Sequence, residues 1–171
     1  MLSRILPVAL VLLVLTGCST PEIEPLTLLQ SKSPVQLLRN EAWYRLPEVM
    51  VKGDSETTDE SVPCDDDPQE LMRSWHSSTI ALVNNSFAPR VVGVGDQLAQ
   101  TFVDQGWEAE RTETDTSVLT VLTRPVSIAV IEIEAVAKTT DHRATVRISA
   151  TGPCVATAGK DSDEVRSLEA E

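Results

Sequence analysis

The spacing of apolar residues predicts helices and one strand before Gly106 and strands alone after it, over the part of the chain that forms the domain. Before that point, apolar side chains recur every three or four positions over 34–45 and 89–105. This spacing predicts two amphipathic helices, the first beginning at Pro34. Between them, residues 73–83 are β-branched and apolar with alternating faces, which predicts a strand.

After Gly106 the period is two, which predicts strands. Their ranges are 107–112, 118–123, 126–137 and 143–151. Gly106 suits the end of the second helix, with Trp107 closing on Phe102.

The last two strands form a hairpin whose register can be predicted if the turn spans 139–142. Glu134 then lies opposite Arg147, and Ile133 lies opposite Ile148. The same register pairs Glu132 with Ser149, Val136 with Thr145 and Ala135 with Val146. One face is polar and the other apolar in both strands, and a one-residue slip would exchange them.

These elements predict an α+β fold in the order β-α-β-β-β-β, with an extra N-terminal helix. The sheet has about five mostly antiparallel strands and a helix on one face. A crossover that makes the first two strands parallel leaves the last strand antiparallel to the first. We expect one domain over 34–157 with an exposed acidic loop at 53–67, a tether over 18–33 and a charged tail over 158–171.

The central strands are predicted to be apolar on both faces, so the second face needs a cover. The side chains that share it, if a short turn at Arg124-Pro125 joins the two strands, are Leu119, Val121, Val126, Ile128 and Val130. We expect the helix from Pro34 onward to cover this face. A partner protein or a lipid is the alternative.

The N-terminus is typical of a secretory signal. Arg4 precedes an apolar run over 5–15, too short to span a bilayer, and small residues close it. The tetrapeptide Leu15-Thr16-Gly17-Cys18 resembles the lipobox of bacterial lipoproteins. This resemblance implies cleavage of residues 1–17 and lipid on Cys18, which would anchor the chain to the outer face of a cell membrane. An ordinary secretory signal and an uncleaved apolar anchor are the alternatives.

The layout of the chain adds a second, less specific resemblance. The lipobox, an N-terminal helix, a cysteine before the first strand, Gly106-Trp107 entering the sheet and Thr151-Gly152-Pro153-Cys154 closing it are similar to small actinobacterial lipoproteins of uncharacterised function. This family implies no catalytic residues.

Charge narrows the range of partners. The chain has 14 basic and 26 acidic side chains, a formal net charge of −12. Removal of residues 1–17 takes away one arginine and leaves a charge of −13. Such a chain is repelled by nucleic acid and by anionic headgroups, so its membrane contact would come from the lipid on Cys18.

With Cys18 lipidated, Cys64 and Cys154 remain, in a compartment where disulfides persist. We predict that they pair. Two free thiols, a catalytic cysteine or half of a metal site are the alternatives, but no cysteine or histidine stands at ligand spacing from either residue.

Candidate catalytic groups are few. Glu132 and Glu134 lie about 7 Å apart on one strand, a spacing compatible with paired carboxylates. With Arg147 opposite Glu134, however, they suit a solvated sheet face. His76 and His142 lack ligand-spaced neighbours. We therefore expect no enzyme, no cofactor and no metal.

The sequence favours a non-enzymatic, membrane-anchored binding or accessory module of the cell envelope, which acts on an envelope protein. A carrier of an apolar ligand and, less favoured, an envelope hydrolase are the alternatives.

Overall fold

The computed structural model describes residues 26–53, 55–64, 69–140 and 142–170. The predicted signal peptide, Cys18 and the first half of the tether lie outside these residues.

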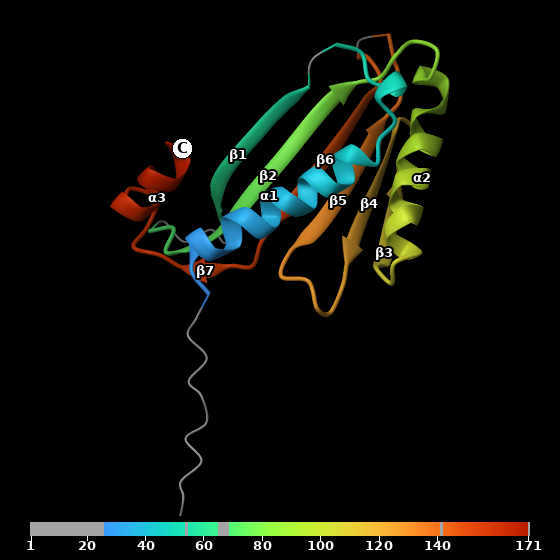
Figure 1. Ribbon diagram of the computed structural model, residues 1–171. Helices are drawn as coiled ribbons and strands as arrows, with labels where there is room; N and C mark the ends of the chain where they lie inside the picture. The colour runs from blue at the N-terminus through green and yellow to red at the C-terminus, as the bar shows by residue number, and fades with distance from the viewer. Residues whose placement is uncertain (1–25, 54, 65–68, 141, 171) are drawn as a thin grey trace, which may run out of the picture.

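All strands belong to one antiparallel sheet of order β1-β2-β6-β5-β4-β3, with the short β7 paired to the start of β2 (Figure 1). Their bounds are β1 Glu56–Pro63, β2 Met72–Leu82, β3 Glu108–Glu113, β4 Ser117–Thr123, β5 Val130–Val136, β6 Thr145–Thr151 and β7 Val155–Ala156. The predicted α+β class is confirmed. The predicted hairpin register is confirmed as well, with Glu134 opposite Arg147 and Ile133 opposite Ile148.

Two helices, α1 (Leu28–Tyr44) and α2 (Val91–Val103), lie on the same face of this sheet (Figure 1). α1 packs on β2 and β6, and α2 packs on β4 and β5. The core between them and the sheet includes Leu122, Ile131, Ile133, Val146 and Ile148, each at most 1% exposed. Most of the folding energy of such a domain comes from burying this apolar layer.

α2 ends as predicted. Gly106 has φ +86°, a conformation that glycine adopts without strain. The Trp107 amide donates to the carbonyl of Phe102 at 3.2 Å, and the two rings meet edge to face with centroids 5.7 Å apart. This contact fixes the direction in which the chain enters β3.

β3 is the exposed edge of the sheet next to α2. Its Arg111 donates through Nε to Asp96 of α2 at 2.9 Å and through Nη1 to Glu113 at 2.5 Å. The hydrogen bond to Asp96 and then that to Glu113 raise the pKa of Arg111 above its ordinary value. Charged side chains such as these protect an edge strand against pairing with another chain.

α1 begins at Leu28 and not at Pro34, so the last part of the expected tether is helical. The Thr27 hydroxyl accepts from the Gln30 amide at 3.2 Å, and the Gln30 side chain accepts from the Thr27 amide at 2.9 Å. This capping box satisfies two amide groups that a helix start otherwise leaves unpaired. Pro34 is therefore inside the helix.

The acidic segment 53–67, expected to be an exposed loop, contains β1. β1 pairs with β2 over eight positions, from Glu56 opposite Ile80 to Pro63 opposite Arg73. The side chains of β1 that face α1, such as Asp59, are polar. The sequence of this strand therefore shows no alternation of apolar and polar residues. Asp59 lies 3.4 Å from the guanidinium of the buried Arg39 on α1.

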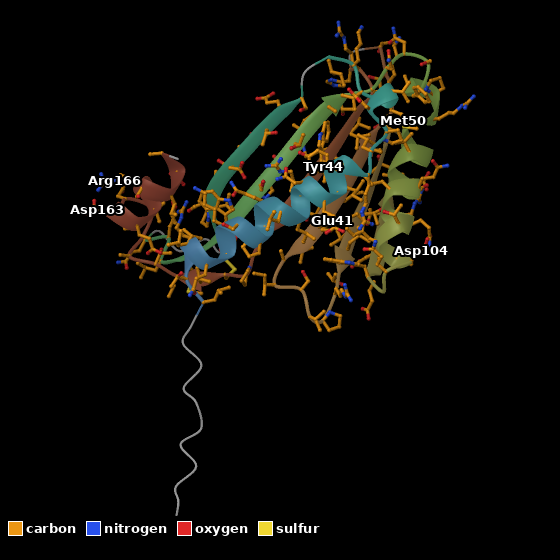
Figure 2. All side chains as sticks on the ribbon, in the orientation of Figure 1. Glu41, Tyr44, Met50, Asp104, Asp163 and Arg166 are labelled. Carbon is orange, nitrogen blue, oxygen red and sulfur yellow. A yellow bond between two sulfur atoms is a disulfide. The ribbon has the colours of Figure 1, made fainter. Side chains whose placement is uncertain are left out.

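The C-terminal residues, expected to be a charged tail over 158–171, contain α3 (Asp163–Glu169). Val165 and Leu168 are buried in one cluster with Trp75 of β2. Figure 2 shows the charged Asp163 and Arg166 on the other side of this helix. Two apolar side chains, three positions apart, are enough to dock it.

Cys64 and Cys154 form the predicted disulfide, with their Cα atoms 6.0 Å apart. It lies where β1 ends, β2 begins and β6 has just ended. α1 begins at this same end of the domain, because Gly152 lies against Val35 of α1. We call this the disulfide end. The opposite end, where β2 and β5 finish and β6 begins, is called the far end.

Candidate functional site

The candidate site is the face of the sheet that points away from α1 and α2. Residues alternate between the two faces of a strand, and the buried positions 131, 133, 146 and 148 face the helices. The remaining positions form what we call the uncovered face. They are Glu56, Thr58, Glu60 and Val62 of β1, Ser74, His76, Ser78, Ile80 and Leu82 of β2, Glu108, Glu110 and Thr112 of β3, Ser117, Leu119, Val121 and Thr123 of β4, Val130, Glu132, Glu134 and Val136 of β5, and Thr145, Arg147, Ser149 and Thr151 of β6.

The structure places the five residues of the expected partner face at two different locations. Leu119, Val121 and Val130 lie on the uncovered face and are partly exposed. Val126 and Ile128 precede β5, in the connection from β4, and are 80% and 44% exposed. There the Ser127 hydroxyl donates to the Ala129 carbonyl at 2.8 Å and holds a turn. The predicted strand over 126–137 therefore begins at Val130.

The expectation that α1 covers this apolar face is wrong. α1 lies on the opposite face, where its buried Arg39 donates to Ser77 at 2.9 Å. Gly152 on the sheet side allows α1 to approach closely, because it has no side chain. A Cβ at this position would lie only 3.0 Å from the side chain of Val35 on α1. No described helix covers the second face, since α3 packs with Trp75 on the helix side.

Further aliphatic side chains extend the apolar part of the uncovered face beyond the predicted residues. They are Val62, Ile80, Leu82 and Val136, each partly buried. Val136 could have been found from the sequence, because the correct hairpin register already placed it beside Glu134 on the outward side. Ile80 and Leu82 needed the pairing of β2 with β6. A solvated sheet face is usually mostly polar, so these side chains mark it as a candidate interface.

Charge on the uncovered face is strongly acidic. Its six glutamates are Glu56, Glu60, Glu108, Glu110, Glu132 and Glu134, whereas Arg147 is its one arginine and it carries no lysine. Arg147 lies 3.8 Å from Glu134, at the limit of an ion pair, and both are well exposed. Such a pair neutralises one glutamate and contributes little to stability. The apolar centre is thus flanked by uncompensated negative charge.

The groups that a hydrolase would need share this face without forming a catalytic network. The register places Thr151, His76 and Glu60 side by side in one row, and Glu132, Ser149 and Ser78 in the next. His76 Nδ1 lies 2.9 Å from the Thr151 hydroxyl. Neither serine forms a side-chain hydrogen bond to His76 within the described part of the chain, so no nucleophile–base pair is assembled.

Metal chemistry has no support on the described residues, which hold no group of three histidine, cysteine, aspartate or glutamate side chains able to bind an ion. None of the helices in the part of the chain that the structure describes is long and apolar enough to cross a bilayer. No protein-family model, no curated protein and no solved structure matches this chain.

Proposed function

We propose that this chain is a lipid-anchored binding module of the cell envelope without enzymatic activity, and that its uncovered face docks a partner protein. The observation that carries the proposal is the apolar centre on a sheet face that no described element covers. The lipobox ending at Cys18 supports the anchor. The Cys64–Cys154 disulfide supports an extracytoplasmic location, because disulfides persist outside the reducing cytosol.

The partner is a protein with a basic, partly apolar surface. Six glutamates with one exposed arginine favour an opposite charge across the interface and speed its encounter. A second copy of this chain fits poorly, because a two-fold interface would place each acidic face against itself. Like charges that meet across an interface oppose association.

A carrier of an apolar ligand has less support. The sheet and α2 are close-packed at Gly95, where an added Cβ would lie 2.9 Å from the Cβ of Ala135. The larger hollows lie at the surface instead. One of 530 Å³ surrounds the end of α1, and one of 450 Å³ lies beside α2 and includes Met50. Figure 2 labels Tyr44 at the end of α1 and Met50 in the short helix that follows it.

The anchor is tested by intact mass spectrometry of protein purified from its native membrane. The expected mass corresponds to cleavage before Cys18 plus acyl chains, with a further gain of about two daltons when the disulfide is reduced. An unlipidated mass, or a mass that retains residues 1–17, would contradict the proposed anchor. The docking proposal is tested separately.

For docking, a photo-crosslinking amino acid replaces Val121 on the uncovered face or Leu37 on the outer side of α1, which is 66% exposed. A discrete adduct is expected from position 121 and not from position 37. Glu110→Lys should weaken this adduct, whereas Glu48→Lys, the same charge change at an exposed site on the helix side, should not. The same adducts from both positions, or none from either, would overturn the docking surface.

A further inference from the structure

A small hollow at the far end of the domain is lined by basic side chains that have no ion-pair partner among the described residues. It has a volume of about 250 Å³ and is lined by Lys52, Asn85, Lys138 and Arg143 over an aliphatic floor that includes Leu82. We propose that this hollow binds a small ligand carrying two or more phosphate or carboxylate groups. The site adjoins the uncovered face at Leu82, but its basic side chains lie outside that face and the proposal does not depend on the proposed docking.

The hollow is assembled from three separate segments of the chain. Lys52 follows the 3-10 turn η1 (Glu48–Met50), and its amide donates to the carbonyl of Leu82, the last residue of β2, at 2.8 Å. Lys138 and Arg143 stand at the two sides of the β5–β6 connection. Lys52 is far in the sequence from Lys138 and Arg143, so the three form no basic run that could have been recognised there. They come together because β2 and β5 end, and β6 begins, at the same end of the sheet.

The three basic side chains differ from most others in this molecule because they line one hollow without an ion pair to any described residue. Seven other basic residues of the described chain are ion-paired, whereas the exposed Arg90 and Arg124 are not; the seven are Arg39, Arg45, Arg73, Arg111, Arg147, Lys160 and Arg166. Lys52, Lys138 and Arg143 form no side-chain hydrogen bond or ion pair with any described residue. The chain has 26 acidic side chains, yet none of the described ones lines this hollow.

Three like charges around one hollow repel each other, and an anion between them would replace repulsion with attraction. Arg143 can donate to two oxygens of one phosphate or carboxylate, whereas the two lysines act as point charges. The Asn85 side chain adds a neutral donor. Three positive charges therefore suit a ligand of charge −2 or −3 whose organic part rests on the aliphatic floor.

Binding is measured by titration calorimetry on the full chain in a nonionic detergent, with pyrophosphate and citrate as probes. A third arm uses a poly(glycerol phosphate) oligomer, in which each phosphate is a diester with a single charge. Binding of pyrophosphate or citrate with one-to-one stoichiometry is expected, and its affinity should fall as salt is raised. Preference for the oligomer over both small anions would assign the ligand to a polymer backbone instead of a free anion or an end group.

The matched variants carry the test. Lys52→Gln combined with Lys138→Gln should weaken binding at least about tenfold, because each removes a charge-assisted contact. Arg90→Gln combined with Arg124→Gln makes the same change in net charge at exposed arginines outside the hollow and should alter affinity by less than about twofold. Equal losses in both double variants would show general electrostatic attraction and would overturn the site.

A final arm addresses Asp141, the acid between Lys138 and Arg143 in the sequence, which lies outside the described residues. Asp141→Asn is titrated with the same probes. If the native chain binds neither anion and the Asp141→Asn chain does, the carboxylate of the protein itself occupies the hollow and the proposed ligand is wrong. Failure of both chains to bind would overturn the proposal as well.

Discussion

Two glycines of α2, Gly93 and Gly95, offer a sharp test of how closely this helix packs on the sheet. Alanine at position 93 would place its Cβ where no atom lies within 4 Å. Helix propensity then predicts a gain of about 0.5–1 kcal/mol in the free energy of unfolding. Alanine at position 95 would place its Cβ 2.9 Å from the Cβ of Ala135, shorter than the ordinary contact of 3.4–4 Å.

α2 must therefore move away from β5 by roughly half an ångström or more before Gly95→Ala can be accommodated. Such overpacking costs about 1–3 kcal/mol, which offsets the propensity gain and leaves a net loss between about zero and about 2.5 kcal/mol. Guanidinium denaturation followed by far-UV circular dichroism should place Gly93→Ala above, and Gly95→Ala below or level with, the native midpoint. A Gly95→Ala chain as stable as Gly93→Ala would refute the close contact.

The remaining predictions concern the disulfide end. Replacing Cys64 and Cys154 by serine opens a loop with a sequence separation of 90, and the chain-entropy model predicts a loss of about 4–5 kcal/mol, measured by the same denaturation. A loss below about 1 kcal/mol would contradict it. Leu168→Ala should cost about 2 kcal/mol and speed amide exchange in α3, because the side chain is 6% exposed, whereas Glu164→Ala should change stability by less than about 0.5 kcal/mol. Equal effects of these two changes would mean that α3 is not docked.

The parts of the fold that could be predicted are those in which one face of an element is apolar and the other polar. In the β5–β6 hairpin, the register that pairs Ile133 with Ile148 also pairs Glu134 with Arg147, so both faces agreed. The disulfide followed from cysteine count and strand direction. These features depend on burial patterns that are local in sequence.

The elements that sequence reasoning missed bury polar groups or few apolar ones. β1 directs Asp59 toward α1, where it meets the buried Arg39, so its inner face shows no hydrophobic period. The first turn of α1 buries Ser31, whose hydroxyl donates to the Leu28 carbonyl at 2.8 Å. A capping signal was present for α3, since the Ser162 hydroxyl accepts from the Val165 amide, but its apolar content was too small to indicate docking.

The candidate site was predicted in part for a similar reason. Alternation placed Leu119, Val121 and Val130 together, but it could not show which face the first helix would take. That choice depends on the fit of Val35 against Gly152, a contact between residues far apart in the chain. The far-end hollow depends on strand ends meeting, which no local pattern reports.

The position of the disulfide also sets how the molecule would respond to mechanical tension. α1 and β1 precede Cys64, so a force applied before Leu28 reaches them before it reaches the covalently closed loop. α1 is held to the sheet by side-chain packing and by bonds such as Arg39 to Ser77, which a pull at its first turn would break in succession. Unwinding its 17 residues would lengthen the chain by roughly 30 Å. Under tension α1 would therefore unfold first and lengthen the chain, while strands β2 to β6, which lie within the loop closed by the disulfide, stay folded.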